Sequence, residues 1–187
     1  MSQERSNAIA ATMSDIAKTM DNDVSEVSLA KAREQLMALA ARPDLFDEAS
    51  FPLPTDTTDR TFLVHQTDGK LALYVCTSKP GLEYTAHDHG GSWAVIAAVS
   101  GAETHRFYSV VCGVPEVIDQ VVCEPGTAVS MLPDGIHSIH AGNEPLLHLH
   151  LYGLAFENQT ERREFDLETG EERRFHLENF TFIEDRR

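Results

Sequence analysis

The stretch EYTAHDHGGSWAVIAAVSG, residues 83–101, places His87 and His89 one residue apart beside an apolar run. Residues i and i+2 of a β-strand point to the same face, so both imidazoles are expected to approach one ion from one side. Imidazole is a common ligand of iron, zinc, copper and nickel. The alternative is a pair of surface histidines at a solvated strand end, because this spacing alone is not specific.

Short strands are predicted on both sides of this stretch. Residues 60–76 form two apolar runs around a turn at Thr67-Asp68-Gly69, which predicts a hairpin. The tail 164–177 indicates another hairpin around Glu168-Thr169-Gly170. Further short strands, separated by Gly or Pro signals and without helices between them, are predicted within 92–101, 106–113, 120–132 and 145–153. This pattern predicts an all-β domain, an antiparallel sandwich or barrel.

The N-terminal part of the chain has a helical pattern instead. Residues 1–22 are polar and rich in Ala, typical of a helix or a loose arm. Residues 23–42 are predicted to form a helix whose N-terminus is a capping box of Asp23 and Glu26. The apolar residues of that helix fall at helical spacing: Leu29, Ala32, Leu36 and Leu39. We therefore expect a helical segment over residues 1–50, packed on a barrel over residues 51–187 that ends in the C-terminal hairpin.

Composition limits the classes of function. The 187 residues suit one domain with an appended segment, and the formal charge is −15. This charge argues against non-specific binding to nucleic acid or to an anionic membrane, because both need a positive field. Three cysteines without ligand spacing suit a reducing compartment, and no apolar run reaches transmembrane length. We expect a cytoplasmic protein; its oligomeric state is not indicated.

Two further segments are rich in histidine. In LPDGIHSIH, residues 132–140, His137 is expected to start a strand after a Pro-Asp-Gly turn, and His140 to face the other way. In LLHLHLYG, residues 146–153, leucines alternate strictly with His148, His150 and Tyr152. The leucine face must be buried, whereas the other face meets either solvent or a polar cavity. Three such segments in one all-β domain favour a shared metal site.

The stretch GLEYTAHDHGGSWAVIAAVSG, residues 81–101, resembles the first cupin motif, with Gly81, His87, His89 and Gly101 at the motif positions. Many cupins carry a ligand Glu where this chain has Trp93 or Ala94, and its absence is a feature of the cysteine dioxygenase-like branch, the thiol dioxygenases. The resemblance covers about residues 60–153 and implies a double-stranded β-helix, the jelly-roll-like cupin barrel.

The resemblance also implies a site. Its members bind Fe(II) through three neutral histidines, which correspond here to His87, His89 and, from the segment GIHSIHAGN, His137. A His-x-Tyr pair near the iron maps onto His150 and Tyr152, as catalytic residues. The implied activity is the oxidation of a small carboxylated thiol, of the cysteine or 3-mercaptopropionate type, to its sulfinate with O2.

Three residues are predicted to contact substrate. Arg60, where cysteine dioxygenases carry an Arg, could pair with the substrate carboxylate through two parallel hydrogen bonds; the alternative is an ordinary surface Arg. His148 occupies the position of a Ser in the family, and Trp93 is expected over the pocket mouth unless it belongs to the core. Gly153 after Tyr152 brings the chain closer to the 3-mercaptopropionate type.

The same residues allow other ligand sets, other metals and other functions. His140 and His148 allow different ligand sets, and the ligand types also suit Zn(II) or Ni(II). A different metallocupin enzyme, such as a lyase, an isomerase or a dioxygenase of a non-thiol substrate, fits the sequence. So does a non-catalytic cupin that binds a small molecule. His65, His105 and His176 have no partner in sequence and are interpreted as structural.

Overall fold

The computed structural model describes residues 2–21, 23–55, 57, 59–67, 70–175 and 181–182. Within them the chain begins with two α-helices and continues almost entirely as short strands, with two 3-10 turns, η1 (Pro43–Leu45) and η2 (Phe156–Asn158). The helices and strands are α1 (Gln3–Met20), α2 (Glu26–Ala40), β1 (Asp59–Gln66), β2 (Ala72–Ser78), β3 (Glu83–His87), β4 (Ala94–Ser100), β5 (Glu103–Val111), β6 (Val114–Cys123), β7 (Ala128–Met131), β8 (Ile136–Ala141), β9 (Leu146–Tyr152), β10 (Arg163–Phe165), β11 (Glu172–Arg174) and β12 (Thr181–Phe182).

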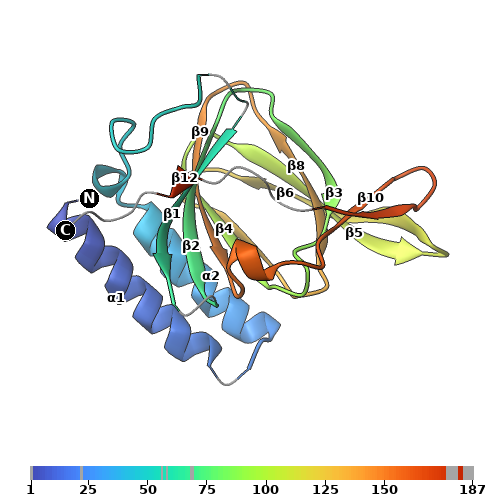
Figure 1. Ribbon diagram of the computed structural model, residues 1–187, viewed down its shortest axis with the longest axis horizontal. Helices are drawn as coiled ribbons and strands as arrows, with labels where there is room; N and C mark the ends of the chain where they lie inside the picture. Colours follow the sequence, from blue (N-terminus) through green and yellow to red (C-terminus); the bar gives the residue numbers. More distant parts are fainter. Residues whose placement is uncertain are drawn as a thin grey trace.

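The strands form two sheets that face each other (Figure 1). One has the order β12-β1-β2-β9-β4-β7 and the other the order β11-β10-β3-β8-β5-β6. In each, a late strand lies between two early ones: β9 between β2 and β4, and β8 between β3 and β5. This interleaving of antiparallel strands is the double-stranded β-helix, and it confirms the predicted fold class.

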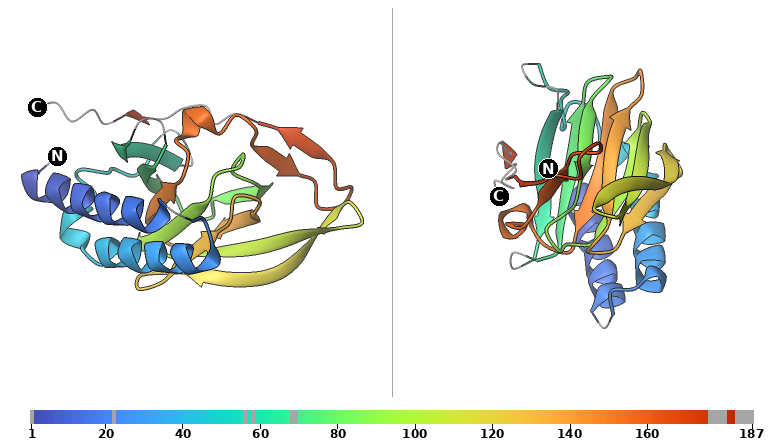
Figure 2. Two further views of the ribbon diagram at one scale, coloured as in Figure 1. Left: turned by 90° about the horizontal axis from the view of Figure 1, so that it is seen from below. Right: turned by 90° about the vertical axis from the view of Figure 1, so that its right-hand side faces the viewer.

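The two helices cover the outer face of the first sheet (Figure 2). Apolar side chains of α1 and α2 pack there against strands β2, β4 and β9, including the alternating residues Leu147, Leu149 and Leu151 of β9. Successive side chains of a strand point to opposite faces, so His148, His150 and Tyr152 point between the two sheets. This face of β9 was predicted to meet either solvent or a polar cavity. The structure shows that it lies in the interior, because all three side chains are buried.

The N-terminal helices agree with the sequence pattern except at one cap. Residues 3–20 form a helix, and Leu29, Ala32, Leu36 and Leu39 of α2 are buried as predicted. The predicted capping box of Asp23 and Glu26 is wrong. Ser25 is the N-cap: its hydroxyl accepts from the Ser28 amide at 3.3 Å, and the Ser28 hydroxyl accepts from the Ser25 amide at 2.9 Å. Two short hydroxyl side chains satisfy these amides reciprocally, which a carboxylate two residues earlier does not do.

The two predicted hairpins are present. Strands β1 and β2 pair antiparallel, although Asp68 and Gly69 of their turn lie outside the described residues. Strands β10 and β11 pair around residues 166–171, which confirms the hairpin in the tail. In the part of the chain that the structure describes, neither helix has the length and apolar character that a membrane span needs.

Candidate metal centre

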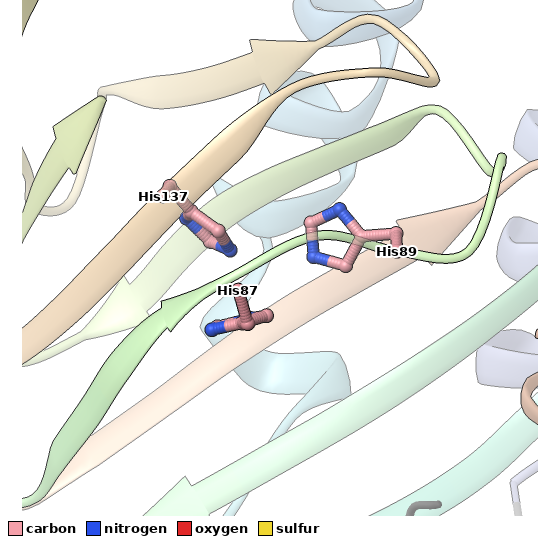
Figure 3. A group of neighbouring side chains, drawn as sticks. All are labelled: His87, His89 and His137. Carbon is pink, nitrogen blue, oxygen red and sulfur yellow. The ribbon is translucent and has the colours of Figure 1, made fainter. Parts of the chain in front are cut away.

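The three histidines predicted as ligands converge between the sheets (Figure 3). His87 ends β3, and its backbone partner across the ladder is His137 of β8. His89 follows two residues later, and the ring centroids of the three imidazoles lie 4.6 to 5.4 Å apart. One donor nitrogen of each residue lies within 4.8 Å of those of the other two. The strand pairing and the turn after β3 therefore bring the three side chains to one point.

The position of His89 differs from the sequence expectation. Strand β3 stops at His87, so His89 does not share a strand face with it. His89 instead begins a turn that the Ser92 amide closes by donating to the His89 carbonyl at 3.1 Å. Gly90 and Gly91 follow with φ of +59° and +82°, values that glycine adopts at little cost. His89 therefore reaches the cluster from the turn after β3, which the glycine pair allows, and not by strand alternation.

The ring nitrogens are arranged as metal donors. The Nδ1–H of His87 donates to the Thr85 carbonyl at 2.8 Å, which leaves its Nε2 with a lone pair. Both ring nitrogens of His89 and the Nε2 of His137 are buried without a hydrogen-bond partner. Buried polar atoms are normally paired, and nitrogens too enclosed for water suit a metal ion about 2.1 Å away. The residues present therefore fit a bound transition metal.

These imidazoles are neutral in the folded protein. Burial, with the charge of Arg162 as the second cause, lowers the pKa of His87 to about 3. The same two causes hold the pKa of His89 well below its usual value. Burial and the neighbouring His87 do so for His137. A metal ligand must be the neutral imidazole, so the site is prepared for binding without releasing protons near neutral pH.

A cavity of about 340 Å³ adjoins this centre. Its wall includes His87 and the inward face of β9, namely His148, His150 and Tyr152. The remainder combines apolar side chains, such as Leu82, Ile139 and Phe175, with polar ones that include the carboxylates of Asp59, Glu103 and Glu164. A volume of this size suits a small molecule, and the apolar lining weakens the competition of water for the polar groups.

Arg162 is the cationic group of the cavity, and the sequence pattern did not single it out. Its side chain is 4% exposed, one NH group donates to Gln159 Oε1 at 2.7 Å, and its Nε has no partner. None of the ion pairs among the described residues involves it. Gly90 allows the close approach, because a Cβ there would lie 2.9 Å from the Arg162 amide nitrogen. A buried guanidinium without a carboxylate partner suits an anionic ligand.

Tyr152 lies beside both His150 and this arginine. Its hydroxyl lies 3.2 Å from the His150 Nδ1, and it interacts electrostatically with Arg162. The Tyr152 ring centroid is 5.2 Å from that of His89. Burial raises the pKa of Tyr152 and lowers that of His150 to about 3, so both groups are neutral. The predicted His-x-Tyr pair therefore lies between the arginine and the histidine cluster.

The remaining predicted residues lie elsewhere. Arg60 is not among the residues that line the cavity, whereas its neighbours Asp59 and Thr61 are, so Arg60 lies on the other face of β1. Trp93 is 7% exposed and belongs to the apolar cluster between the first sheet and the helices. His140 faces away from the centre, with its Nδ1 3.6 Å from the Glu83 carboxylate.

Glu103 and His105 are a second pair that sequence reasoning missed. Their side chains are 4% and 0% exposed, and His105 Nδ1 lies 3.0 Å from His137 Nδ1. His105 was interpreted as structural because no histidine neighbours it in sequence. The available signal was Glu103-x-His105, whose side chains share a face once β5 is known to begin at Glu103. His65 lies in β1 away from the cavity wall, and His176 is outside the described residues.

Comparisons with known proteins concern the fold. No protein-family model matches the chain, and no curated protein sequence matches it. Among solved structures, CapF in complex with 3-isopropenyl-tropolone is 21% identical, with a TM-score of 0.50, over 58% of this chain and 32% of CapF. A Klebsiella pneumoniae protein with a double-stranded β-helix domain is 16% identical, with a TM-score of 0.47, over 59% of this chain and 84% of that one.

A third similar structure comes from work on the DMSP lyases RdDddP and RnDddQII. It is 21% identical, with a TM-score of 0.41, over 51% of this chain and 44% of its own. These neighbours are cupin proteins, and the chain spans less than half of CapF and of the DMSP lyase structure. At such identities the similarity shows the fold alone, a double-stranded β-helix, and the candidate histidine metal centre rests on the geometry of this chain.

Proposed function

We propose that the protein is an Fe(II)-dependent dioxygenase that converts a small carboxylated thiol to its sulfinate with O2. The observation that carries the proposal is a cluster of three neutral histidines without a carboxylate among them, beside a cavity lined by Arg162, an arginine that forms no ion pair among the described residues. In the overall reaction R–SH and O2 give R–SO2⁻ and a proton. Two S–O bonds form, the O–O bond breaks, and sulfur supplies the four electrons that reduce O2.

Ferrous iron held by His87, His89 and His137 would bring the thiolate and O2 together and pass electrons from sulfur to oxygen. The protein orients the substrate. The Arg162 guanidinium pairs with the substrate carboxylate, which is the planar anion that its geometry matches best. This pairing fixes one end of the substrate and directs the sulfur toward the histidines, because His87 and Arg162 both line the cavity.

Tyr152 has the second role. Neutral His150 holds the phenol through its Nδ1, and the phenolic O–H donates a hydrogen bond to the sulfur substituents as negative charge grows on their oxygens. The raised pKa of Tyr152 keeps that proton in place near neutral pH. The apolar side chains of the wall, such as Phe156 and Phe175, limit the access of water.

Oxygen uptake by the anaerobically iron-loaded protein tests the proposal. The panel comprises cysteine, 3-mercaptopropionate, cysteamine and mercaptosuccinate, and the product mass is recorded with ¹⁸O2. We expect uptake with at least one carboxylated thiol, with both labelled atoms in its product. Cysteamine lacks the carboxylate and is expected to react poorly. His87→Ala, treated identically, controls for iron in solution.

Two outcomes would contradict the proposal. The first is no uptake with any thiol despite one bound iron per chain, which would favour another metallocupin chemistry. The second is uptake with the product carrying one labelled oxygen or none, which would exclude a dioxygenase. Equal rates with cysteamine and with the carboxylated thiols would remove the role assigned to Arg162 and leave the reaction class standing.

A further inference from the structure

Glu103 is a buried carboxylate shared by two imidazoles. It begins β5 and is 4% exposed. Its Oε1 lies 2.9 Å from His105 Nε2 and 2.9 Å from His148 Nδ1. A buried charge is costly unless it is hydrogen-bonded, and both imidazoles are themselves 1% exposed or less. The carboxylate therefore depends on these two N–H donors.

The direction of each hydrogen bond follows from the charge of Glu103. The same oxygen, Oε1, contacts a ring nitrogen of each imidazole, and two N–H donors at 2.9 Å favour the ionised carboxylate. An ionised carboxylate only accepts hydrogen bonds. Both imidazoles must donate to it: His105 through Nε2–H and His148 through Nδ1–H.

The same assignment fixes the direction of the hydrogen bond between His105 and the metal ligand His137. The relay assigns to His105 the tautomer with its single N–H on Nε2, toward Glu103, which leaves a lone pair on Nδ1. That atom lies 3.0 Å from His137 Nδ1, which must then be the donor. The proton of His137 is thereby placed on Nδ1, and its Nε2 keeps the lone pair. His137 Nε2 is the atom that is buried without a partner in the three-histidine cluster.

We propose that Glu103 is a positioning residue for the metal centre, acting on the ligand His137 through His105. The chain Glu103–His105–His137 sets the tautomer and ring orientation of that ligand and increases its electron donation to the metal. The proposal rests on the metal centre of the proposed function but not on its thiol chemistry. Neither Glu103 nor His105 was predicted as a functional residue from the sequence.

Glu103 also belongs to a second group of potential ligands, with His148 and His150, whose donor atoms lie within 4.8 Å of one another. The relay accounts better for the contacts, because the carboxylate Oε1 already accepts two N–H bonds. His148 Nε2, buried without a partner, is the one atom in this group that the relay leaves unexplained. A second bound metal is therefore a distinct outcome of the test.

The test measures Co(II) binding by the full chain in competition with a chelator. Glu103→Gln keeps the shape but puts an amide in place of the carboxylate, and we expect Co(II) affinity to fall about 10- to 100-fold with one ion still bound. His105→Gln should cause a similar loss, and the double variant no further loss, because both changes break one chain. Glu83→Gln is the matched control: it removes an exposed carboxylate next to His140 and should leave the affinity unchanged.

A second readout does not depend on any variant. In the Zn(II)-loaded, ¹⁵N-labelled wild type, imidazole NMR should show His137 protonated on Nδ1 and His105 protonated on Nε2. The opposite tautomer of His105 would overturn the relay. So would an unchanged Co(II) affinity of Glu103→Gln, or two ions per wild-type chain falling to one in that variant. A protein that binds one ion through this relay but oxidises no thiol would refute the proposed function alone.

Discussion

Asp88, the residue between His87 and His89, is bound to Arg163 of the C-terminal hairpin. Its Oδ1 accepts from the Arg163 amide at 2.9 Å and from the Gly90 amide at 3.1 Å. Its Oδ2 accepts from Arg163 Nε at 2.7 Å. The Asp88 side chain is 6% exposed, whereas that of Arg163 is 42% exposed. The histidine pair is thus held in place by a strand about 75 residues further along the chain.

Replacing Asp88 tests this connection. In Asp88→Ala two backbone amides lose their acceptor, and we expect the free energy of unfolding to fall by about 2–3 kcal/mol. Metal affinity should fall as well, because His87 and His89 lose their support. Arg163→Gln removes only a half-exposed partner and should cost less than about 1 kcal/mol. Urea denaturation of the metal-free variants gives both values; equal losses would contradict the central role of Asp88.

The three-histidine centre predicts a sharp difference between two histidines of β8. His137→Ala should abolish stoichiometric metal binding, because two imidazoles retain an ion poorly. His140→Ala, on the same strand but facing Glu83, should bind metal as the wild type does. Metal content after dialysis, measured by mass spectrometry, checks the pair. Full retention of metal by His137→Ala would exclude this residue as a ligand.

The two candidate arginines can be separated by kinetics. Arg162 lines the cavity, so Arg162→Met should weaken the use of a carboxylated thiol by about 2–3 kcal/mol in kcat/KM, the value of a hydrogen bond to a charged group. The weak reaction of cysteamine should change little. Arg60→Met should leave both reactions near wild type, since Arg60 lies outside the cavity wall. A large loss with Arg60→Met and none with Arg162→Met would identify Arg60, as the sequence predicts, as the partner of the substrate carboxylate.

Gly153 follows Tyr152 and lies under the indole of Trp93. A Cβ at position 153 would lie 2.6 Å from Trp93 Cδ1, which is too close for any side chain. Gly153→Ala should therefore destabilise the fold by about 1–3 kcal/mol through overpacking. The cost should shrink in a Trp93→Leu background, where the indole is absent, so a double-mutant cycle by urea denaturation should show strong coupling. Additive costs would contradict the contact.

The buried neutral histidines predict a loss of stability in acid. Burial lowers the pKa of His150 to about 3, whereas in the unfolded chain it titrates near its ordinary value of 6.5. Between these values the unfolded state binds more protons, so stability is present above pH 6.5 and falls as the pH drops toward 3. His150 alone contributes a slope of about 1.4 kcal/mol per pH unit.

The matched variant for this effect is His150→Gln. Urea denaturation of the metal-free protein across the acidic range should show a shallower dependence on pH in the variant than in the wild type. Identical slopes would mean that His150 is not buried in its neutral form. The difference between the two proteins is the informative quantity, because His87 and Glu103 titrate in the same direction in both.

The sequence by itself determined the class of fold and the three histidine-rich segments. Strict alternation in residues 146–152 predicted which side chains of β9 share a face, and turn residues marked the ends of the strands. These are local properties with a period of two residues, so they can be derived without knowing the partners of a strand. The pair His87 and His89 indicated a metal site from the residues alone, whereas the choice of His137 over His140 came from the resemblance to the thiol dioxygenases.

Only the tertiary structure decided that the histidine face of β9 is buried as well, because that depends on the second sheet packing over it. It also placed Arg162 rather than Arg60 at the cavity and joined Glu103 and His105 to His137. In these cases the partners are separated by long stretches of chain, and the contact exists only once strands from distant segments pair. Local pattern carries no information about such pairing, which the packing of the two sheets determines.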